Sequence, residues 1–255
     1  MSRDLGNGKA FVRAAATHAA EMYEWYANLP TVSVADLVPD EEAAKHTAVF
    51  SADMINGFCK EGALASPRVD AISQPVADLF ARMYGVGVRK FVLAQDAHHE
   101  QAKEFKVFPP HAIQGTPEAE TITELLALSF SEIFEVCKKN SLSPAVPGIG
   151  GWFGQYCLMN DFQTAIAVGN CTDLCLRELA MYLCMWANTS HCDVRIIIPA
   201  NCVQTFHMPP EVARAIEQEH GLSQGAVKPH PGDLMHVQAL YEMSRNGIEV
   251  VKEIV

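Results

Sequence analysis

Several side chains that could take part in chemistry stand at or just after the ends of short apolar runs in this sequence. They are Asp53, Asp96, His98, Lys139, Cys171 and Cys175. In an open parallel β-sheet, ligands bind beyond the carboxyl ends of the strands. Carboxylates, a lysine and thiols gathered at such an edge could supply a general base, a positive charge and a nucleophile. This placement indicates an enzyme.

The elements expected to position these residues are short apolar strands that alternate with helical stretches. Strands are predicted at Thr47–Asp53, Lys90–Gln95, Ile133–Lys138, Thr164–Gly169 and Val194–Pro199, with an edge strand at Ile248–Ile254. Helical spacing of apolar residues is clearest at 176–187 and 234–243. Buried strands separated by helices are typical of βαβ units, whose parallel sheet is covered on both faces. The pattern therefore predicts an α/β fold, in a single domain over residues 1–255.

Residues 1–46 precede this pattern. Apolar residues at steps of three and four from Phe11 to Leu29 predict a helix, which Pro30 ends. Residues 30–47 contain an acidic cluster and are interpreted as a polar connector. We therefore expect an N-terminal helical extension and a connector within the same domain.

The composition limits the kinds of partner. The chain has 255 residues, of which 49% are hydrophobic, and its 19 Lys and Arg against 30 Asp and Glu give a formal net charge of −11. Nucleic acids and anionic membranes attract basic surfaces, so neither is expected as a partner. The chain has no apolar run long enough for a membrane span, and its first twenty residues do not resemble a secretory signal. The eight cysteines are expected as free thiols of a cytoplasmic protein.

Cys175 lies where a predicted strand turns into a predicted helix. At a helix N-terminus, the helix dipole and free N–H groups lower the pKa of a thiol and can hold an oxyanion. The alternative is that Cys175 is a small buried apolar residue, as most cysteines are. A disulfide with Cys171 is not expected in a cytosolic chain. A phosphatase loop from Cys171 to Arg177 is disfavoured because Asp173 would repel phosphate.

Asp53 and a lysine could complete a site around this thiol. A carboxylate at the end of a buried strand loses solvation, so its pKa should rise and it could accept the thiol proton. The alternative for Asp53 is a helix N-cap or a turn. Lys139 could supply positive charge to a thiolate or oxyanion, although the adjacent Lys138 shows that lysines after strands are often simply solvated.

A second set of residues could bind a metal. Asp96 and His98, two positions apart, point to the same side of an extended chain. Glu104 and His111 can return on the following loop, which Pro109 and Pro110 stiffen. Two imidazoles and two carboxylates suit zinc, iron or manganese. The alternative is a polar surface loop.

Taken together, these motifs resemble the isochorismatase-like cysteine hydrolases, and among them the nicotinamidases. The resemblance rests on Ser-Ala-Asp-Met-Ile-Asn-Gly-Phe-Cys, Gln-Asp-Ala-His-His, Pro-Pro-His-Ala-Ile-Gln-Gly-Thr and Gly-Asn-Cys-Thr-Asp-Leu-Cys. It runs from about residue 47 to the C-terminus. It implies a three-layer α/β/α fold with a mostly parallel, six-stranded sheet.

The resemblance also implies roles for individual residues. The implied catalytic triad is Asp53, Lys139 and Cys175, and the backbone N–H groups of Cys171 and Cys175 would hold the oxyanion. The implied metal ligands are Asp96, His98 and His111, with Glu104 where some members carry a third histidine. A cis peptide bond is implied between Asn170 and Cys171.

The expected activity is the hydrolysis of nicotinamide to nicotinate and ammonia through a cysteine thioester. A divalent metal would anchor the ring nitrogen, with zinc expected and iron or manganese as alternatives. Phe58 and Phe108 are candidates for sandwiching the ring, with plain core packing as the alternative. A homo-oligomer acting on a small carboxamide is expected. The alternatives are another amidase or carbamoyl hydrolase of the superfamily, or a catalytically silent member that acts as a binding protein.

Overall fold

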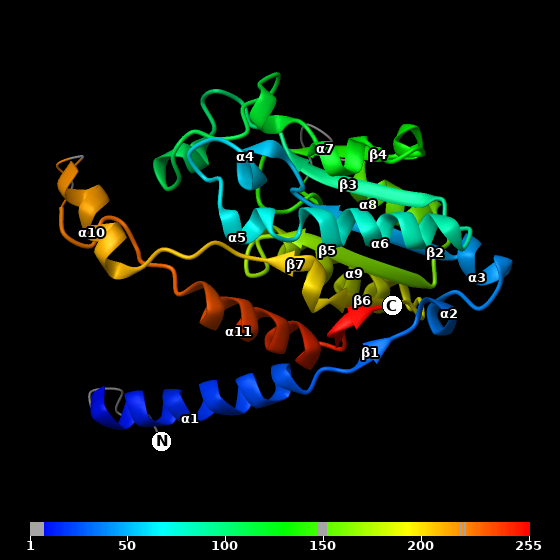
Figure 1. The fold of residues 1–255 in the computed structure, drawn as a ribbon, viewed down its shortest axis with the longest axis horizontal. Coiled ribbons are helices and arrows are strands. Elements are labelled where there is room, and N and C mark those ends of the chain that lie inside the picture. The colour runs from blue at the N-terminus through cyan, green and yellow to red at the C-terminus, as the bar shows by residue number, and fades with distance from the viewer. Residues whose placement is uncertain (1–7, 147–151, 220, 222) are drawn as a thin grey trace.

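The computed structural model describes residues 8–146, 152–219, 221 and 223–255. Their centre is a parallel sheet with the strand order β4-β3-β2-β5-β6-β8, and the short strand β7 also pairs with β5 (Figure 1). Its strands are β2 (Thr47–Ala52), β3 (Lys90–Asp96), β4 (Glu135–Lys139), β5 (Thr164–Asn170), β6 (Arg195–Pro199), β7 (Val203–Gln204) and β8 (Glu249–Val251). The predicted parallel α/β sheet is therefore confirmed, with β7 as an addition to the six expected strands.

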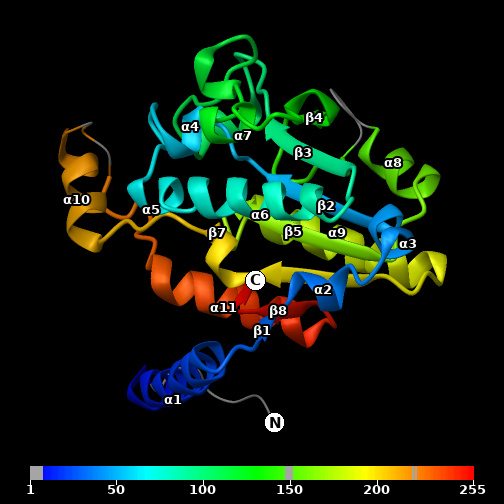
Figure 2. The same cartoon turned by 45° about the vertical axis from the view of Figure 1, so that its right-hand side comes forward.

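Helices cover both faces of the sheet. The helix α6 (Ser73–Gly85) lies on one face and α9 (Cys175–Ser190) on the other (Figure 2). Side chains of β2 alternate between the two layers, since Val49 joins the cluster under α6 and Phe50 the cluster under α9. Burial on both sides explains why these strands read as continuous apolar runs. The other α-helices that follow β2 are α4 (Asn56–Cys59), α5 (Pro67–Asp70), α7 (Thr123–Leu126), α8 (Phe153–Met159), α10 (Pro210–Glu219) and α11 (Gly232–Arg245).

Several predicted strand ends differ from the structure by one or two residues, and one predicted strand is divided. The strand predicted from Ile133 begins only at Glu135, because residues Ser131–Ile133 form a 3₁₀ turn. The predicted tail strand is split at Lys252, whose N–H donates to Pro30 O, into β8 and β9 (Glu253–Ile254). The strands β3, β4 and β5 each run one residue further than predicted, to Asp96, Lys139 and Asn170. Functional candidates therefore occupy the last strand positions.

The N-terminal region is more ordered than a helix followed by a plain connector. The predicted helix is α1 (Gly8–Ala27), which has no buried residue and lies along α11, with Trp25 edge-on to Tyr241 at 5.3 Å. The predicted connector instead contains β1 (Thr31–Val32), paired with β9, and the helices α2 (Val34–Leu37) and α3 (Glu41–Lys45). Ser33 and Asp40 are the N-caps of α2 and α3, so these polar residues of the connector mark where short helices begin.

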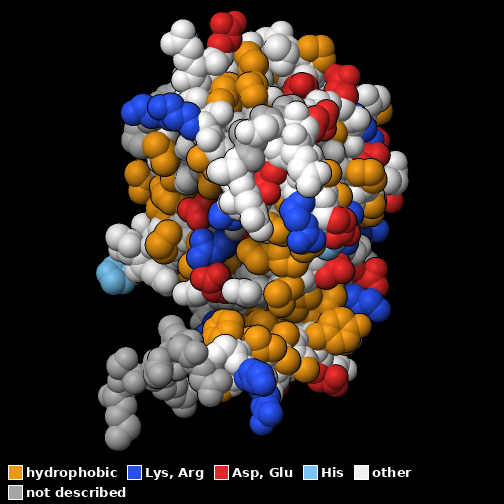
Figure 3. Space-filling model, turned by 90° about the vertical axis from the view of Figure 1, so that its left-hand side faces the viewer, with side chains coloured by type: hydrophobic (Ala, Val, Ile, Leu, Met, Phe, Trp, Pro, Cys, Tyr) orange, Lys and Arg blue, Asp and Glu red, His pale blue; other side chains and the backbone are white. Residues whose placement is uncertain are grey.

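Two features concern contact with a membrane: the charges on the surface, and the length and apolarity of the helices. On the face shown in Figure 3, acidic and basic side chains are interspersed with apolar ones. Within the described part of the chain, no helix is both long and apolar enough to cross a bilayer.

Candidate active site

The ends of β2, β3, β4 and β5 meet at one edge of the sheet. Asp53 follows β2 directly, and its N–H donates to Ala94 O at 2.8 Å. Asp96 and Lys139 are paired in the β3–β4 register. Gly169 on β5 has a φ of +108°, and a Cβ there would lie 2.1 Å from Ala52 O. Only glycine lets the two strands approach this closely next to Asp53.

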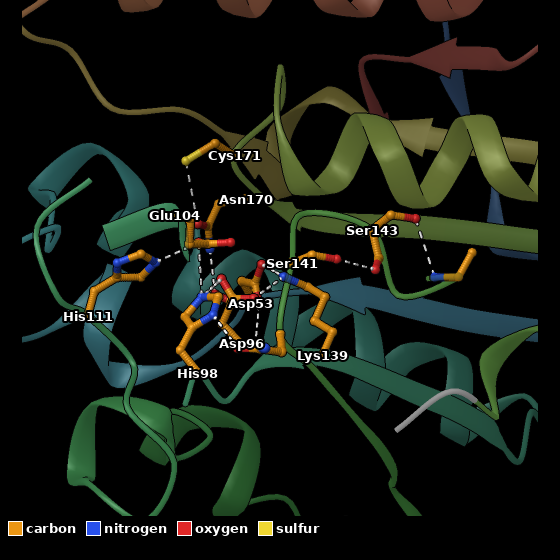
Figure 4. A network of polar contacts seen from close by, with 12 residues as sticks. Asp53, Asp96, His98, Glu104, His111, Lys139, Ser141, Ser143, Asn170 and Cys171 are labelled. Atoms are coloured by element: carbon orange, nitrogen blue, oxygen red, sulfur yellow. Dashed lines mark hydrogen bonds and ion pairs between the residues drawn. The ribbon is translucent and has the colours of Figure 1, made fainter. Parts of the chain in front are cut away.

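A buried ion pair network forms the floor of the site (Figure 4). Lys139 Nζ lies 2.7 Å from Asp53 Oδ2 and 2.5 Å from Asp96 Oδ1, and Asp53 Oδ1 accepts a hydrogen bond from the Asp96 N–H at 2.7 Å. All three residues are buried, whereas Lys138 points to the opposite side of the strand and is exposed. The structure therefore places Lys139, and not Lys138, with the two carboxylates. Asp53 is fully buried, caps no described helix and has a left-handed φ of +50°.

Burial and neighbouring charges set the protonation of this network. Burial raises the pKa of Asp53 to about 6, with Asp96 adding to the shift and Lys139 opposing it. Burial alone would also raise the pKa of Asp96, but Lys139 and His98 outweigh it and lower that pKa. Burial lowers the pKa of Lys139, yet the two carboxylates raise it well above its usual value. The lysine is thus a permanent cation beneath the site.

Cys175 is the first residue of α9 and lies beside this network. Its Sγ and carboxylate oxygens of Asp53 and Asp96 lie within 4.8 Å of one another. Burial raises the pKa of the Cys175 thiol well above its usual value, and Lys139 only partly opposes the shift. The expectation of a thiol pKa lowered by the helix N-terminus is therefore wrong, because loss of solvation outweighs the dipole. A buried thiol of this kind needs a base.

The other features of this turn agree with the sequence analysis. The described part of the chain contains no disulfide, so none joins Cys171 and Cys175. The peptide bond between Asn170 and Cys171 is cis. Arg177 pairs with Glu178 and Glu242, which leaves it outside any phosphate loop.

Two histidines and two carboxylates meet next to Asp53 and Lys139 (Figure 4). His98 Nε2 lies 3.3 Å from Asp96 Oδ2 and 3.2 Å from Glu104 Oε1, and His111 Nε2 lies 3.6 Å from Glu104 Oε1. Atoms of Asp96, His98 and His111 lie close enough together to bind one ion. These residues thus lie in the interior and not on a surface loop, apart from Glu104, whose side chain is 21% exposed.

The hydrogen bonds of the two rings prepare them for a metal. His98 Nδ1 faces Asn140 Oδ1 at 3.1 Å, and His111 Nδ1 faces Pro109 O at 2.8 Å. Asn140 Oδ1 also accepts the His99 N–H at 3.1 Å, which identifies that atom as an acceptor. Both Nδ1 atoms therefore face acceptors, so a neutral ring carries its proton on Nδ1 and presents the Nε2 lone pair to a metal. The buried His98 Nε2 makes no hydrogen bond to any described residue, as expected of a ligand atom.

Asp53, Asp96 and Cys175 form a second cluster with atoms near enough for an ion. The ammonium of Lys139 already contacts both of its carboxylates. A metal there would have to displace a buried cation, so the histidine-containing cluster is the better metal site.

A cavity of about 250 Å³ is lined by Cys175 and, next to it, by Asp96, Glu104 and His111. Phe58 and Phe108 line it, with ring centroids 5.5 and 6.3 Å from that of His111. Phe58 also packs into the core cluster under α6. No Lys or Arg is found among the described residues that line the cavity.

Several residues of the site were not predicted from the sequence. Asn140, which orients His98, directly follows Lys139 at the strand end and could have been found by the same argument. Phe105 packs edge-on against His98 and His111. The wall formed by Phe206, His207 and Met208 comes from a distant segment, which no local spacing points to.

Comparisons with known proteins agree with this geometry. No family model matches the chain. Over 214 residues it is 27% identical to nicotinamidase 1 of Arabidopsis thaliana, which covers 79% of this chain and 84% of that protein. An isochorismatase-like hydrolase of Alkaliphilus metalliredigens superposes with a TM-score of 0.57 at 20% identity, over 80% of this chain and 93% of that one. A pyrazinamidase of Pyrococcus horikoshii in complex with zinc superposes with a TM-score of 0.58 at 21% identity, over 81% and 99%.

The fold is thus that of the isochorismatase-like hydrolases. The predicted three-layer architecture is confirmed. The resemblance that the motifs indicated is confirmed as well, since the curated relative named above is a nicotinamidase.

Proposed function

We propose that this chain is a nicotinamidase-like amidohydrolase, which converts nicotinamide to nicotinate and ammonia. At the coarser level it is an amide-bond hydrolase, as its similarity to a nicotinamidase and a pyrazinamidase indicates. The single observation that carries the proposal is the meeting of Asp53, Lys139 and Cys175 beside a largely apolar cavity that Cys175 lines.

In the first half of the reaction, Asp53 takes the proton of the Cys175 thiol as the sulfur attacks the carboxamide carbon. The backbone N–H groups of Cys171 and Cys175 hold the developing oxyanion, and Cys175 can do so because the first N–H of a helix has no partner within the helix. Asp53 then gives its proton to the departing nitrogen as the C–N bond breaks. The products are ammonia and a thioester.

In the second half, water attacks the thioester carbon and gives a proton to Asp53. The C–S bond breaks and the proton held by Asp53 returns to the Cys175 sulfur, while the nicotinic acid that forms loses its remaining proton to water or ammonia and leaves as nicotinate. Lys139 stays protonated throughout, because two buried carboxylates raise its pKa. Its charge stabilises the thiolate and the tetrahedral states.

The residues that would hold a divalent metal are Asp96, His98, Glu104 and His111. The free Nε2 lone pairs and the carboxylates fit such an ion, and zinc is the metal in the Pyrococcus horikoshii relative. Iron and manganese suit the same donors. When bound, the metal supplies a Lewis acid that can take the ring nitrogen of a pyridine.

The cavity favours an uncharged aromatic carboxamide. Phe58 and Phe108 offer ring faces, while the acidic side chains in the lining are Asp96 and Glu104. A substrate with its own carboxylate, such as an N-carbamoyl amino acid, would find no arginine or lysine among the described lining residues.

Ammonia release from a panel of amides tests the proposal. We expect turnover of nicotinamide and pyrazinamide, and release from N-carbamoyl amino acids at least roughly 100-fold slower in kcat/KM, because one unpaired buried carboxylate costs several kcal/mol. Faster release from the carbamoyl substrates would assign the chain to the carbamoyl hydrolases. Absence of release from every amide would favour a binding protein.

A second prediction concerns the metal. Asn140→Ala removes the acceptor that orients His98, so we expect metal affinity to fall roughly 10- to 100-fold. Competition with a chelator, followed by elemental analysis, measures this directly. The KM for nicotinamide should rise in parallel, while alkylation of Cys175 by a small thiol reagent should keep its rate.

Asn160→Ala is the matched control, because the Asn160 amide donates only to Tyr156 O at the end of α8. Active protein without bound metal would contradict the assignment. So would a chelated enzyme with an unchanged KM.

The remaining expectations belong to the same proposal. We propose that residues 1–255 act as one domain, in a cytoplasmic homo-oligomer with a role in NAD salvage. The packing of α1 along α11 supports the inclusion of the N-terminal helix in that unit.

A further inference from the structure

One wall of the cavity is the short segment Phe206–Met208. Hydrogen bonds from residues that do not line the cavity hold this segment in place. Met208 and His230 form an antiparallel bridge with both N–H···O distances at 2.8 Å. The Gly232 N–H donates to His207 Nδ1 at 3.0 Å. A Cβ on Gly232 would lie 2.5 Å from Phe206 O, so this close approach requires glycine. The wall is therefore fixed by the chain around residues 230–232.

The ring of His230 joins this wall to the turn that carries the nucleophile. It stacks on Phe206 with centroids 3.9 Å apart and planes at 14°. Its Nδ1 lies 2.9 Å from Phe206 O, and its Nε2 lies 2.8 Å from Asp173 Oδ2. Asp173 stands between Cys171 and Cys175 in the sequence, in the turn before α9. One side chain thus ties together two parts of the site that are remote in sequence.

Both partners of this ring can only accept hydrogen bonds. Phe206 offers a carbonyl oxygen, and Asp173 offers a carboxylate whose other oxygen accepts from the Thr205 hydroxyl at 2.6 Å. A neutral imidazole has a single N–H, whereas an imidazolium has two. Only the protonated ring satisfies both contacts.

We propose that His230, as an imidazolium, is a positioning residue that holds the cavity wall Phe206–Met208 against the nucleophile turn through Asp173. The substrate site is then fully formed only while His230 carries both protons. Its effect on nicotinamide binding rests on the proposed function, but its protonation does not.

The charges around the ring agree with this assignment. Burial lowers the pKa of His230, but Asp173 outweighs burial and raises it above the ordinary histidine value, with Arg68 of α5 opposing. Burial raises the pKa of Asp173, but His230 and Thr205 outweigh burial and lower it. Because the pKa of His230 is raised in the folded protein, the clamp is complete at low pH. It is lost as the pH rises through that raised pKa.

Ring ¹⁵N NMR tests the protonation state without any substrate. In the folded wild type at pH 6, both nitrogens of His230 should carry protons, and the ring should titrate above the reference value of about 6.5. Asp173→Asn should bring the titration down towards that reference. The resonance is assigned by its loss in His230→Gln. A single ring proton at pH 6, or titration below the reference, would overturn the proposal.

Kinetics test the positioning role. His230→Gln keeps only one donor atom, so the KM for nicotinamide should rise roughly tenfold, as for loss of a hydrogen bond to a charged group, with a much smaller change in kcat. The wild-type KM should rise at alkaline pH, and this rise should be absent in the variant. His18→Gln on the exposed face of α1 is the matched control and should behave as wild type. An unchanged KM, or a KM profile that keeps its alkaline rise, would refute the role. If the wild type does not hydrolyse nicotinamide, the proposed function fails and the NMR result still decides the clamp.

Discussion

Replacement of Cys175 by alanine is expected to reduce nicotinamide hydrolysis by roughly 10⁴-fold or more, to near the uncatalysed rate. Its Sγ is the sulfur placed with Asp53 at the end of the cavity, and no thioester can form without it. The variant should stay folded, because alanine fits where a small buried thiol was. Ammonia release and circular dichroism measure the two quantities.

Cys171→Ala is the matched control, since Cys171 also lines the cavity and is also buried. Burial raises the pKa of the Cys171 thiol to about 12, and that thiol points to Asn170 Oδ1 at 3.7 Å. Its oxyanion role uses the backbone N–H, which alanine keeps. Equal losses in both variants, or an active Cys175→Ala protein, would show that the nucleophile is misassigned.

Replacement of Lys139 by alanine should lower the rate by roughly 10³-fold or more, because the thiolate and oxyanion lose their buried cation. Lys138→Ala should leave the rate near wild type, because Lys138 lies on the exposed side of the same strand. A large loss from Lys138→Ala with normal activity in Lys139→Ala would contradict the structure.

The lysine variant also tests stability. Without Lys139, Asp53 and Asp96 are left buried next to each other without their cation, which should destabilise the fold by about 3–5 kcal/mol. Activity is therefore compared at a temperature where circular dichroism shows a folded variant. The metal content of the variant, measured separately, shows whether Asp96 keeps its position as a proposed ligand.

Much of this site could be predicted because parallel strands bring their carboxyl ends to one edge. Asp53, Asp96 and Lys139 each end an apolar run, and the runs are visible without any tertiary information. The choice between Lys138 and Lys139 required the register of β4, which decides the face of each side chain.

Other features depend on tertiary contacts that spacing does not encode. The pKa of Cys175 follows from how deeply it is buried, and a helix N-terminus visible in the sequence says nothing about that depth. His230 and Asp173 are separated by 57 positions in the sequence, and only the folded chain brings them to 2.8 Å. The short helices α2 and α3 were hidden because their polar residues resemble a connector.

The buried ion pair network of Asp53, Asp96 and Lys139 has a consequence for the net charge of the interior. Asp53, Asp96, Glu104 and Lys139 lie within one small region, and when all are ionised the three carboxylates exceed the single ammonium by two charges. A doubly charged cation on the histidine side brings this region to formal neutrality. A singly charged ion leaves an excess negative charge, and a triply charged ion leaves an excess positive one, each of which is unfavourable away from water. A divalent ion is therefore the one whose charge this set of side chains would balance.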